Sequence, residues 1–397
     1  MPKFVMKLLR AFAAIFLFMT FVVSCSSDRK EKLWSEKMAE SEIKRHPESW
    51  MLDFAKKPKW GYCQGLETYA IYQVYKVNGD RSYFNFVRSY GDTMIMEDGK
   101  IRTYDFEKYN IDNIAGGKTL LVLYDETGQE KYKIAADTLV KQMGSHPRTT
   151  EGGFWHKLVY PHQMWLDGLF MGSPFLAIYA SRYNKPELFD EVAHQIILVG
   201  KHTHDPKTGL YYHGWDESRK QKWANKKTGA SPNFWSRSIG WYMMAIVDVL
   251  EYLPENHPRR QEIIKILQDL SIALEKYRDP EAGVWYQVTD QVGREKNYLE
   301  SSGTCMFMYA WIKGANNGWL DSSYKEKANQ LFDDVLRAFV KTNEDGTISI
   351  TNGCCVSGLG GNPYRDGSYE YYTSEPYRNN DPKSVSPFIL TALQLKR

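Results

Sequence analysis

Two aspartates stand where predicted helices begin, in segments rich in aromatic residues. Asp112 lies in the run Tyr-Asn-Ile-Asp-Asn, and Asp167 follows Trp165 by two residues. Rings around Asp167 would exclude water, and this favours the protonated carboxyl that a general acid needs. Two carboxylates in one cleft, an acid and a base or supporting charge, are the set that cleaves glycosidic bonds. Each could instead serve its own helix, Asp112 as an N-terminal cap and Asp167 opposite the helix dipole.

Further polar and aromatic residues stand in the same loops or in the helices that the loops lead into. His156 and His213 could donate hydrogen bonds to a sugar or its carboxylate, although loop histidines are commonly only solvated. Arg237 and Trp241 are four residues apart, so they share one helix face. Together they would offer a fork for a carboxylate beside a ring that stacks on a sugar. The same pair could instead form a cation–π contact that only stabilises the helix.

The composition excludes several classes of protein. The 397 residues include 27 Tyr, 12 Trp and 18 Phe, which suits either a carbohydrate cleft or a large helical core. The 51 basic and 48 acidic residues form no Lys/Arg cluster, so we expect no nucleic-acid partner. His202, His204 and Asp205 lack a further ligand at zinc spacing, and no nucleotide-binding motif is present. We therefore expect neither a metal ion nor a cofactor.

The first residues resemble an export signal rather than part of the fold. Three basic residues precede an apolar run from Ala11 to Val23, which is too short for a comfortable membrane span. Val22 to Cys25 then form a lipobox, in which Cys25 would be lipidated; a plain secretory signal is the alternative. We expect an exported bacterial lipoprotein, periplasmic or at the cell surface, with the lipid as its only membrane contact. The expected parts are a signal peptide (1–24), a lipidated cysteine with a tether (25–32) and one catalytic domain (33–397).

Apolar residues at three-to-four spacing predict an all-α chain after the tether. Short and long connections alternate, so the helices form six hairpins that close into an (α/α)6 barrel, a toroid whose long loops build one cleft at one end. An open array of helix pairs is the alternative, but its repeats would be shorter and more regular. The predicted helices span 33–46, 64–78, 81–96, 112–126, 128–143, 165–183, 185–202, 234–253, 258–278, 299–314, 321–340 and 384–396.

Two serine–proline pairs refine these boundaries. Ser231-Pro232 predicts a helix cap followed by a first-turn proline. Ser173-Pro174 predicts a kink or a restart within the predicted helix 165–183.

Several long runs resemble glycoside hydrolase family 105, the unsaturated rhamnogalacturonyl hydrolases. They are YNIDNIAGG (109–117), the segment 146–175 with FWHKLVYPHQMWLDG, YYHGWDE (211–217), FWSRSIGWYMMAIVDVL (234–250) and the glycine-containing segment 358–393. The similarity covers about 55 to 395 in order. It implies an (α/α)6 barrel, in agreement with the hairpin count.

The resemblance also implies a reaction and a set of site residues. Enzymes of this family remove a 4,5-unsaturated uronic acid from the non-reducing end of oligosaccharides made by lyases, by hydration of the C4=C5 double bond. Asp167 matches the catalytic aspartate and Asp112 the second carboxylate. Arg237 and His213 would hold the sugar carboxylate, and Trp235 would stack on its ring. The remaining matched positions that would bind substrate are His156, Trp241, Lys157 and Tyr62.

Two alternatives remain open on sequence alone. One is the sister activity on unsaturated glucuronic acid from glycosaminoglycans, ulvan or other uronate polymers. Cys63 and Cys354-Cys355 depart from the commonest family pattern and bear on which sugar occupies the adjacent subsite. The other alternative is a lipid-anchored glycan-binding protein without catalysis, but that class would have lost Asp167 or Asp112.

Overall fold

The computed structural model describes residues 32–397, so the expectations for the signal peptide and for Cys25 lie outside the described residues. All twelve predicted helices are present close to their expected positions. Six inner helices are α3 (Tyr62–Asn78), α5 (Gly117–Thr127), α7 (Leu166–Tyr183), α9 (Ser236–Leu250), α11 (Ser301–Asn316) and α14 (Pro382–Leu395). Six outer helices are α2 (Trp34–Arg45), α4 (Arg81–Met94), α6 (Glu130–Ser145), α8 (Glu187–Thr203), α10 (Arg260–Glu275) and α12 (Ser323–Phe339).

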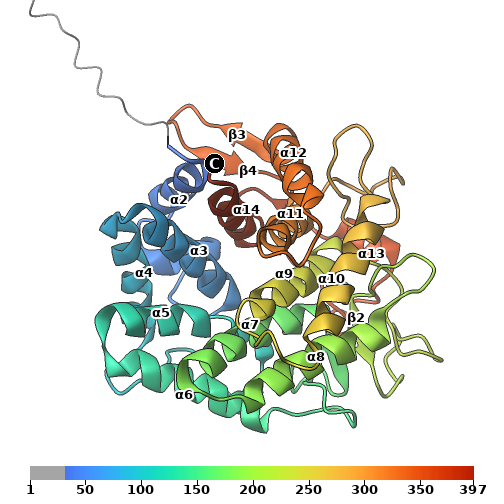
Figure 1. Cartoon of the computed structure of the whole chain (residues 1–397), viewed down its shortest axis with the longest axis horizontal. Coiled ribbons are helices and arrows are strands. Elements are labelled where there is room, and N and C mark those ends of the chain that lie inside the picture. Colours follow the sequence, from blue (N-terminus) through green and yellow to red (C-terminus); the bar gives the residue numbers. More distant parts are fainter. Residues whose placement is uncertain (1–31) are drawn as a thin grey trace, which may run out of the picture. The chain divides into compact units, whose positions relative to one another are not determined.

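The inner helices form a closed ring. Each of α3, α5, α7, α9, α11 and α14 packs against the next, and α14 packs against α3 again (Figure 1). Burial follows this position: every residue of α9 is buried, whereas α12 buries one face only. A helix that is apolar all round belongs inside a fold, and an amphipathic one belongs on its outside. The predicted (α/α)6 barrel is confirmed.

Five helical hairpins follow one another along the chain. The sixth pairs the first helix of the described chain with the last. Helices α3 and α4 meet at Gly79, whose left-handed φ of 75° lets its N–H reach the Tyr75 carbonyl at 2.8 Å. The sixth pair consists of α2 and α14, which lie side by side although one opens and the other closes the described chain (Figure 1). The Ser35 N–H donates to the Arg397 carbonyl at 3.4 Å.

The predicted cap at Ser231 and the predicted restart at Ser173-Pro174 are wrong, and a kink at Pro174 stays a prediction. Helix α9 begins at Ser236, and Ser231 instead accepts the Gly214 N–H at 3.2 Å through its hydroxyl, so a loop contact uses the side chain that was expected to cap a helix. Helix α7 continues through Pro174 without a restart. A proline removes one backbone hydrogen bond, and the packing of the buried stretch 166–180 of this helix holds it together across that gap.

Short strand pairs and turns shape the long loops. The pairs are β1 (Gln163–Trp165) with β2 (Gly214–Asp216), β3 (Val340–Thr342) with β4 (Ile348–Ile350), and β5 (Gly353–Cys354) with β6 (Tyr377–Arg378), all antiparallel. One further short helix, α13 (Tyr369–Ser374), lies in the last long loop. From residue 32 onward, no helix has the length and apolarity needed to cross a bilayer.

Candidate active site

A cavity of about 150 Å³ opens where the inner helices begin. Of the nine sequence-predicted active-site residues, all except His213 line this cavity, which we call the carboxylate cavity. Its lining consists of Tyr62, Asp112, His156, Lys157, Tyr160, Trp165, Asp167, Met171, Trp235, Arg237, Trp241, Val356, Ser357 and Arg365. The loops and first turns of five inner helices, α3, α5, α7, α9 and α14, therefore converge as the toroid predicted.

The β1–β2 pair positions the third and fourth loops against each other. Trp165 pairs with Gly214, and the Leu166 N–H donates to the His213 carbonyl at 3.0 Å. Gly214 has no room for a side chain, because a Cβ there would lie 2.9 Å from both Trp165 Cδ1 and Leu359 Cδ1. This close approach places His213 beside Asp167 in the first turn of α7.

Asp167 is almost fully buried, with 8% of its surface exposed. Its Oδ2 lies 3.1 Å from Nε2 of His213, which has no exposed surface. The two atoms are close without the alignment of a hydrogen bond, and neither has another hydrogen-bond partner among the described residues. On the far side of the imidazole, Nδ1 lies 2.7 Å from the Tyr372 hydroxyl. His213 thus lies behind the carboxylate instead of lining the cavity.

Asp112 is held by two basic side chains. Its Oδ2 lies 2.6 Å from Lys157 Nζ, and its Oδ1 lies 3.4 Å from His156 Nε2. Burial raises the pKa of Asp112, but Lys157 and His156 outweigh burial and hold that pKa below its ordinary value. Asn110 caps the following 3-10 turn by accepting the Asp112 N–H at 3.1 Å. The capping role considered for Asp112 therefore belongs to Asn110, and the carboxylate is left for the cavity.

His156 is a neutral partner in this arrangement. Burial lowers its pKa to about 4, although Asp112 acts in the opposite direction. Its ring stacks on Trp165 at 4.2 Å between centroids, and Trp165 stacks on Tyr160 at 4.9 Å. These three flat rings form one wall of the cavity.

The opposite wall contains Arg237 and two tryptophans. Arg237 is 1% exposed, and its Nη1 donates to the Cys354 carbonyl and to Ser302 Oγ. Its Nε has no hydrogen-bond partner in the described chain. The guanidinium carbon lies 4.7 Å from the ring centre of Trp235, so the cation–π contact forms with Trp235 while Trp241 stacks on Phe170 at 4.7 Å.

Sequence reasoning missed six residues of the lining. The most informative is Arg365, which donates to the Tyr160 hydroxyl at 2.8 Å and to the Gly360 carbonyl at 2.8 Å. Arg365 and Tyr160 stand inside the segments that carry the family resemblance, so the signal was present, but their contact across 205 positions needs the fold. The other missed residues are Trp165, Met171, Val356 and Ser357.

A closed ring of helix pairs with two carboxylates in one small cavity defines a glycoside hydrolase. Residues 34–397 match the model of Glycosyl Hydrolase Family 88, and the chain belongs to that family. The predicted membership in family 105 is confirmed by the structure of a family 105 glycoside hydrolase from C. acetobutylicum ATCC 824. That structure is 44% identical with a TM-score of 0.89, and the match covers 92% of this chain and 99% of the other.

Two other relatives extend the comparison. The unsaturated rhamnogalacturonyl hydrolase YesR of Bacillus subtilis (strain 168) is 27% identical over 307 residues, which are 76% of this chain and 80% of YesR. The unsaturated glucuronyl hydrolase of Bacillus sp. GL1 is 12% identical with a TM-score of 0.67, over 91% of this chain and 95% of that one. The second similarity shows the shared fold alone.

Proposed function

We propose that this enzyme removes a 4,5-unsaturated uronic acid from the non-reducing end of oligosaccharides produced by a lyase acting on rhamnogalacturonan or related pectin. The observation that carries the proposal is a pair of carboxylates, the buried Asp167 and the half-buried Asp112, in a cavity of about 150 Å³. The similarity to YesR supports the rhamnogalacturonan class.

The proposed reaction is hydration of a vinyl ether. Asp167 gives its proton to C4, and positive charge develops at C5 and the ring oxygen. The resulting Asp167 carboxylate accepts a proton from the water that adds to C5. The hemiketal at C5 then opens, and the hemiacetal left at C1 releases the next sugar as an alcohol. One water is consumed in all.

The other side chains have distinct parts in this proposal. Asp112, ionised beside Lys157, stabilises the positive charge that develops next to it. The buried Arg237, which has an unpartnered Nε, attracts the uronate carboxylate. His213 keeps Asp167 in place from behind. Trp165 and Trp241 supply apolar faces for the sugar ring.

The test follows the ultraviolet absorbance of the unsaturated uronate. The chain from residue 26 onward is mixed separately with lyase-made oligosaccharides from rhamnogalacturonan, homogalacturonan, ulvan and chondroitin. Loss of absorbance with the rhamnogalacturonan product is the expected result. Loss only with ulvan or chondroitin would assign the glucuronyl activity instead. A folded protein that binds these sugars but leaves all four unchanged would be a glycan-binding protein.

We also propose that the protein is exported and anchored through a lipid on Cys25, in the periplasm or at the cell surface. Support comes from the basic residues, apolar run and lipobox before Ser26. Metabolic labelling with a radioactive fatty acid should mark the protein in its host. A Cys25→Ser variant should lose the label, and a wild-type protein that takes up no label would contradict the anchor.

A further inference from the structure

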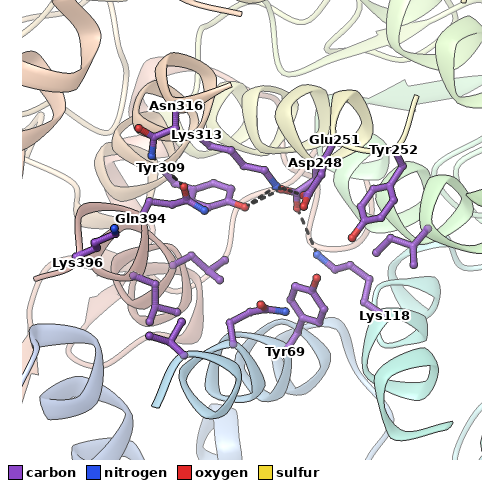
Figure 2. Close-up of a pocket in the computed structure, with 15 residues that line it drawn as sticks. Tyr69, Lys118, Asp248, Glu251, Tyr252, Tyr309, Lys313, Asn316, Gln394 and Lys396 are labelled. Carbon is purple, nitrogen blue, oxygen red and sulfur yellow. Dashed lines mark hydrogen bonds and ion pairs between the residues drawn. The ribbon is translucent and has the colours of Figure 1, made fainter. Parts of the chain in front are cut away.

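A second cavity, of about 360 Å³, lies on the axis of the barrel away from the carboxylate cavity. All six inner helices or their immediate C-terminal extensions contribute to it. Its polar lining consists of Tyr69, Gln73, Lys118, Asp248, Glu251, Tyr252, Tyr309, Lys313, Asn316, Gln394 and Lys396 (Figure 2). We call this space the second cavity. Its lining residues have no part in the reaction proposed above.

The two cavities are separated along the helices. On α7, Asp167 lines the carboxylate cavity and Ile178 lines the second one, and on α9 the corresponding residues are Arg237 and Asp248. Eleven residues of helix span about 16 Å. Phe170 lies between the cavities, with Trp241 stacked on it at 4.7 Å and Lys118 Nζ at 4.2 Å from its ring centre. A molecule in the second cavity therefore does not reach Asp167.

Charged side chains are buried in the second cavity, and one of them lacks a hydrogen bond. Asp248 Oδ1 accepts from Lys313 at 2.7 Å and from the Tyr309 hydroxyl at 2.8 Å. Lys118 is 2% exposed, and its Nζ lies 3.6 Å from Asp248 Oδ2, beyond hydrogen-bond distance. Within the described chain this ammonium has no hydrogen-bond partner. A buried ammonium without a hydrogen bond destabilises the fold unless a water or a ligand supplies the missing acceptor.

Neutral polar groups beside Lys118 are also unused. The hydroxyls of Tyr69 and Tyr252 and the side-chain amide of Gln73 form no hydrogen bond with any other described residue. All three side chains are half-buried and line the cavity. Figure 2 shows Tyr69, Tyr252, Lys118 and Asp248 around one hollow. These hydroxyls and this amide are therefore open to a ligand in the second cavity.

We propose that the second cavity binds an uncharged saccharide of one or two residues. A sugar hydroxyl both donates and accepts, so a single one can accept from Lys118 Nζ and donate to Asp248 Oδ2. Lys313 pairs with Asp248 at 2.7 Å and with Glu251 at 2.6 Å, so Lys118 is the cation nearest the free Asp248 Oδ2. The carbonyl ends of α3, α9, α11 and α14 point to this end of the barrel and disfavour an anion here. The ring of Tyr252 suits a C–H face of a pyranose, whereas Lys118 Nζ already lies 4.7 Å from the ring centre of Tyr69.

The second cavity is larger than one bridging water needs, and either a cluster of waters or a small ligand would fill it. One water occupies about 30 Å³ in the liquid, so a single bridging water leaves most of the cavity unfilled. The proposal does not depend on the reaction in the carboxylate cavity, because it concerns different residues and a different kind of ligand.

The test is calorimetric titration of the purified protein with D-galactose, L-rhamnose, D-glucose and D-galacturonate, each up to about 50 mM. At least one neutral sugar should bind. Tyr252→Phe and Lys118→Met should each weaken this binding roughly 10-fold, which corresponds to one lost hydrogen bond. Tyr69→Phe provides a further readout should Lys118→Met fail to fold. Lys157→Met, which alters only the carboxylate cavity, should leave the affinity for the neutral sugar unchanged.

Several outcomes would overturn the proposal. These are no binding by any neutral sugar, binding that survives both Tyr252→Phe and Tyr69→Phe unchanged, or binding that Lys157→Met abolishes. Binding of D-galacturonate alone, weakened by Tyr252→Phe, would show an anion site and refute the uncharged class. Crystals soaked in the neutral sugar that binds should show it between Lys118 and Asp248.

Discussion

His213 holds its imidazole between Asp167 and a tyrosine hydroxyl. Nε2 lies 3.1 Å from Asp167 Oδ2 and Nδ1 lies 2.7 Å from the Tyr372 oxygen. If Tyr372 donates to Nδ1, the neutral imidazole carries its proton on Nε2, the nitrogen that faces Asp167. Tyr372 comes from α13, about two hundred residues after Asp167, so the last long loop determines the surroundings of the carboxylate on α7.

The Tyr372→Phe variant tests this relationship. Without the hydroxyl, the Nε2 tautomer of His213 is no longer favoured, and we expect kcat to fall about 10-fold while KM changes less than about 2-fold. Tyr369→Phe is the matched control, because it removes a hydroxyl of the same helix that bonds to the Glu295 carbonyl. An equal fall in kcat in both variants would show that the Tyr372 hydroxyl has a structural role only.

Asp167→Asn keeps the size of the side chain and removes its proton transfer. We expect kcat to fall about 10³-fold with an unchanged melting temperature and intact sugar binding. The measurement is the loss of unsaturated-uronate absorbance together with calorimetric titration of the substrate. Asp190→Asn, on the exposed face of α8, should behave as the wild type. An active Asp167→Asn enzyme would refute the proposed mechanism.

Lys157→Met removes the cation that lies 2.6 Å from Asp112. Burial raises the pKa of Asp112 and Lys157 lowers it, so the variant should have a higher pKa at this carboxyl. If ionised Asp112 is required, the acid limb of the pH profile of kcat/KM moves to higher pH. Lys133→Met breaks a comparable ion pair, with Asp137 at 2.7 Å, far from the cavity. Its profile should not move.

Arg237→Ala should affect both binding and stability. Losing attraction for the uronate carboxylate raises KM about 10- to 100-fold, and the Cys354 carbonyl left unpaired destabilises the fold by about 1–3 kcal/mol. Arg260→Ala separates the two effects, because Arg260 is also buried and donates to the Leu250 and Leu253 carbonyls away from the cavity. A loss of stability without a rise in KM in both variants would assign Arg237 a purely structural role.

The neutral state of His156 makes stability depend on pH. Burial lowers its pKa to about 4, whereas the unfolded chain takes up this proton near pH 6.5. As pH falls from about 6.5 to 4, only the unfolded state gains the proton, so the free energy of unfolding falls by up to about 3 kcal/mol from this residue. Urea denaturation at several pH values measures the slope. His156→Gln should flatten it, and His162→Gln, at an exposed site, should not.

The helices were predictable because their signals are local. Apolar spacing along α9 or α12 and the short turn at Gly79 suffice to place them. The family motifs placed Asp112 and Asp167 correctly in one cavity. Contacts between loops that are distant in the sequence could not be predicted from these local signals.

Two residues show what local signals lack. Ser231 was expected to cap a helix, but its hydroxyl bonds to Gly214, and only the β1–β2 pair brings that partner near. Lys118 is a helix residue of ordinary polarity in the sequence, yet the closed ring buries it completely. Both outcomes follow from packing between segments remote in sequence, which propensity does not encode.

The pairing of α2 with α14 has a topological consequence. The first and last helices of the described chain complete the ring together. The two ends of the described chain therefore lie next to each other. A circular permutant that joins these ends with a short linker and opens the exposed turn at Gly79 would keep every inner helix beside its own neighbours. The order of the helices along the chain can thus change while their order around the ring stays the same. The carboxylate cavity depends on the order around the ring.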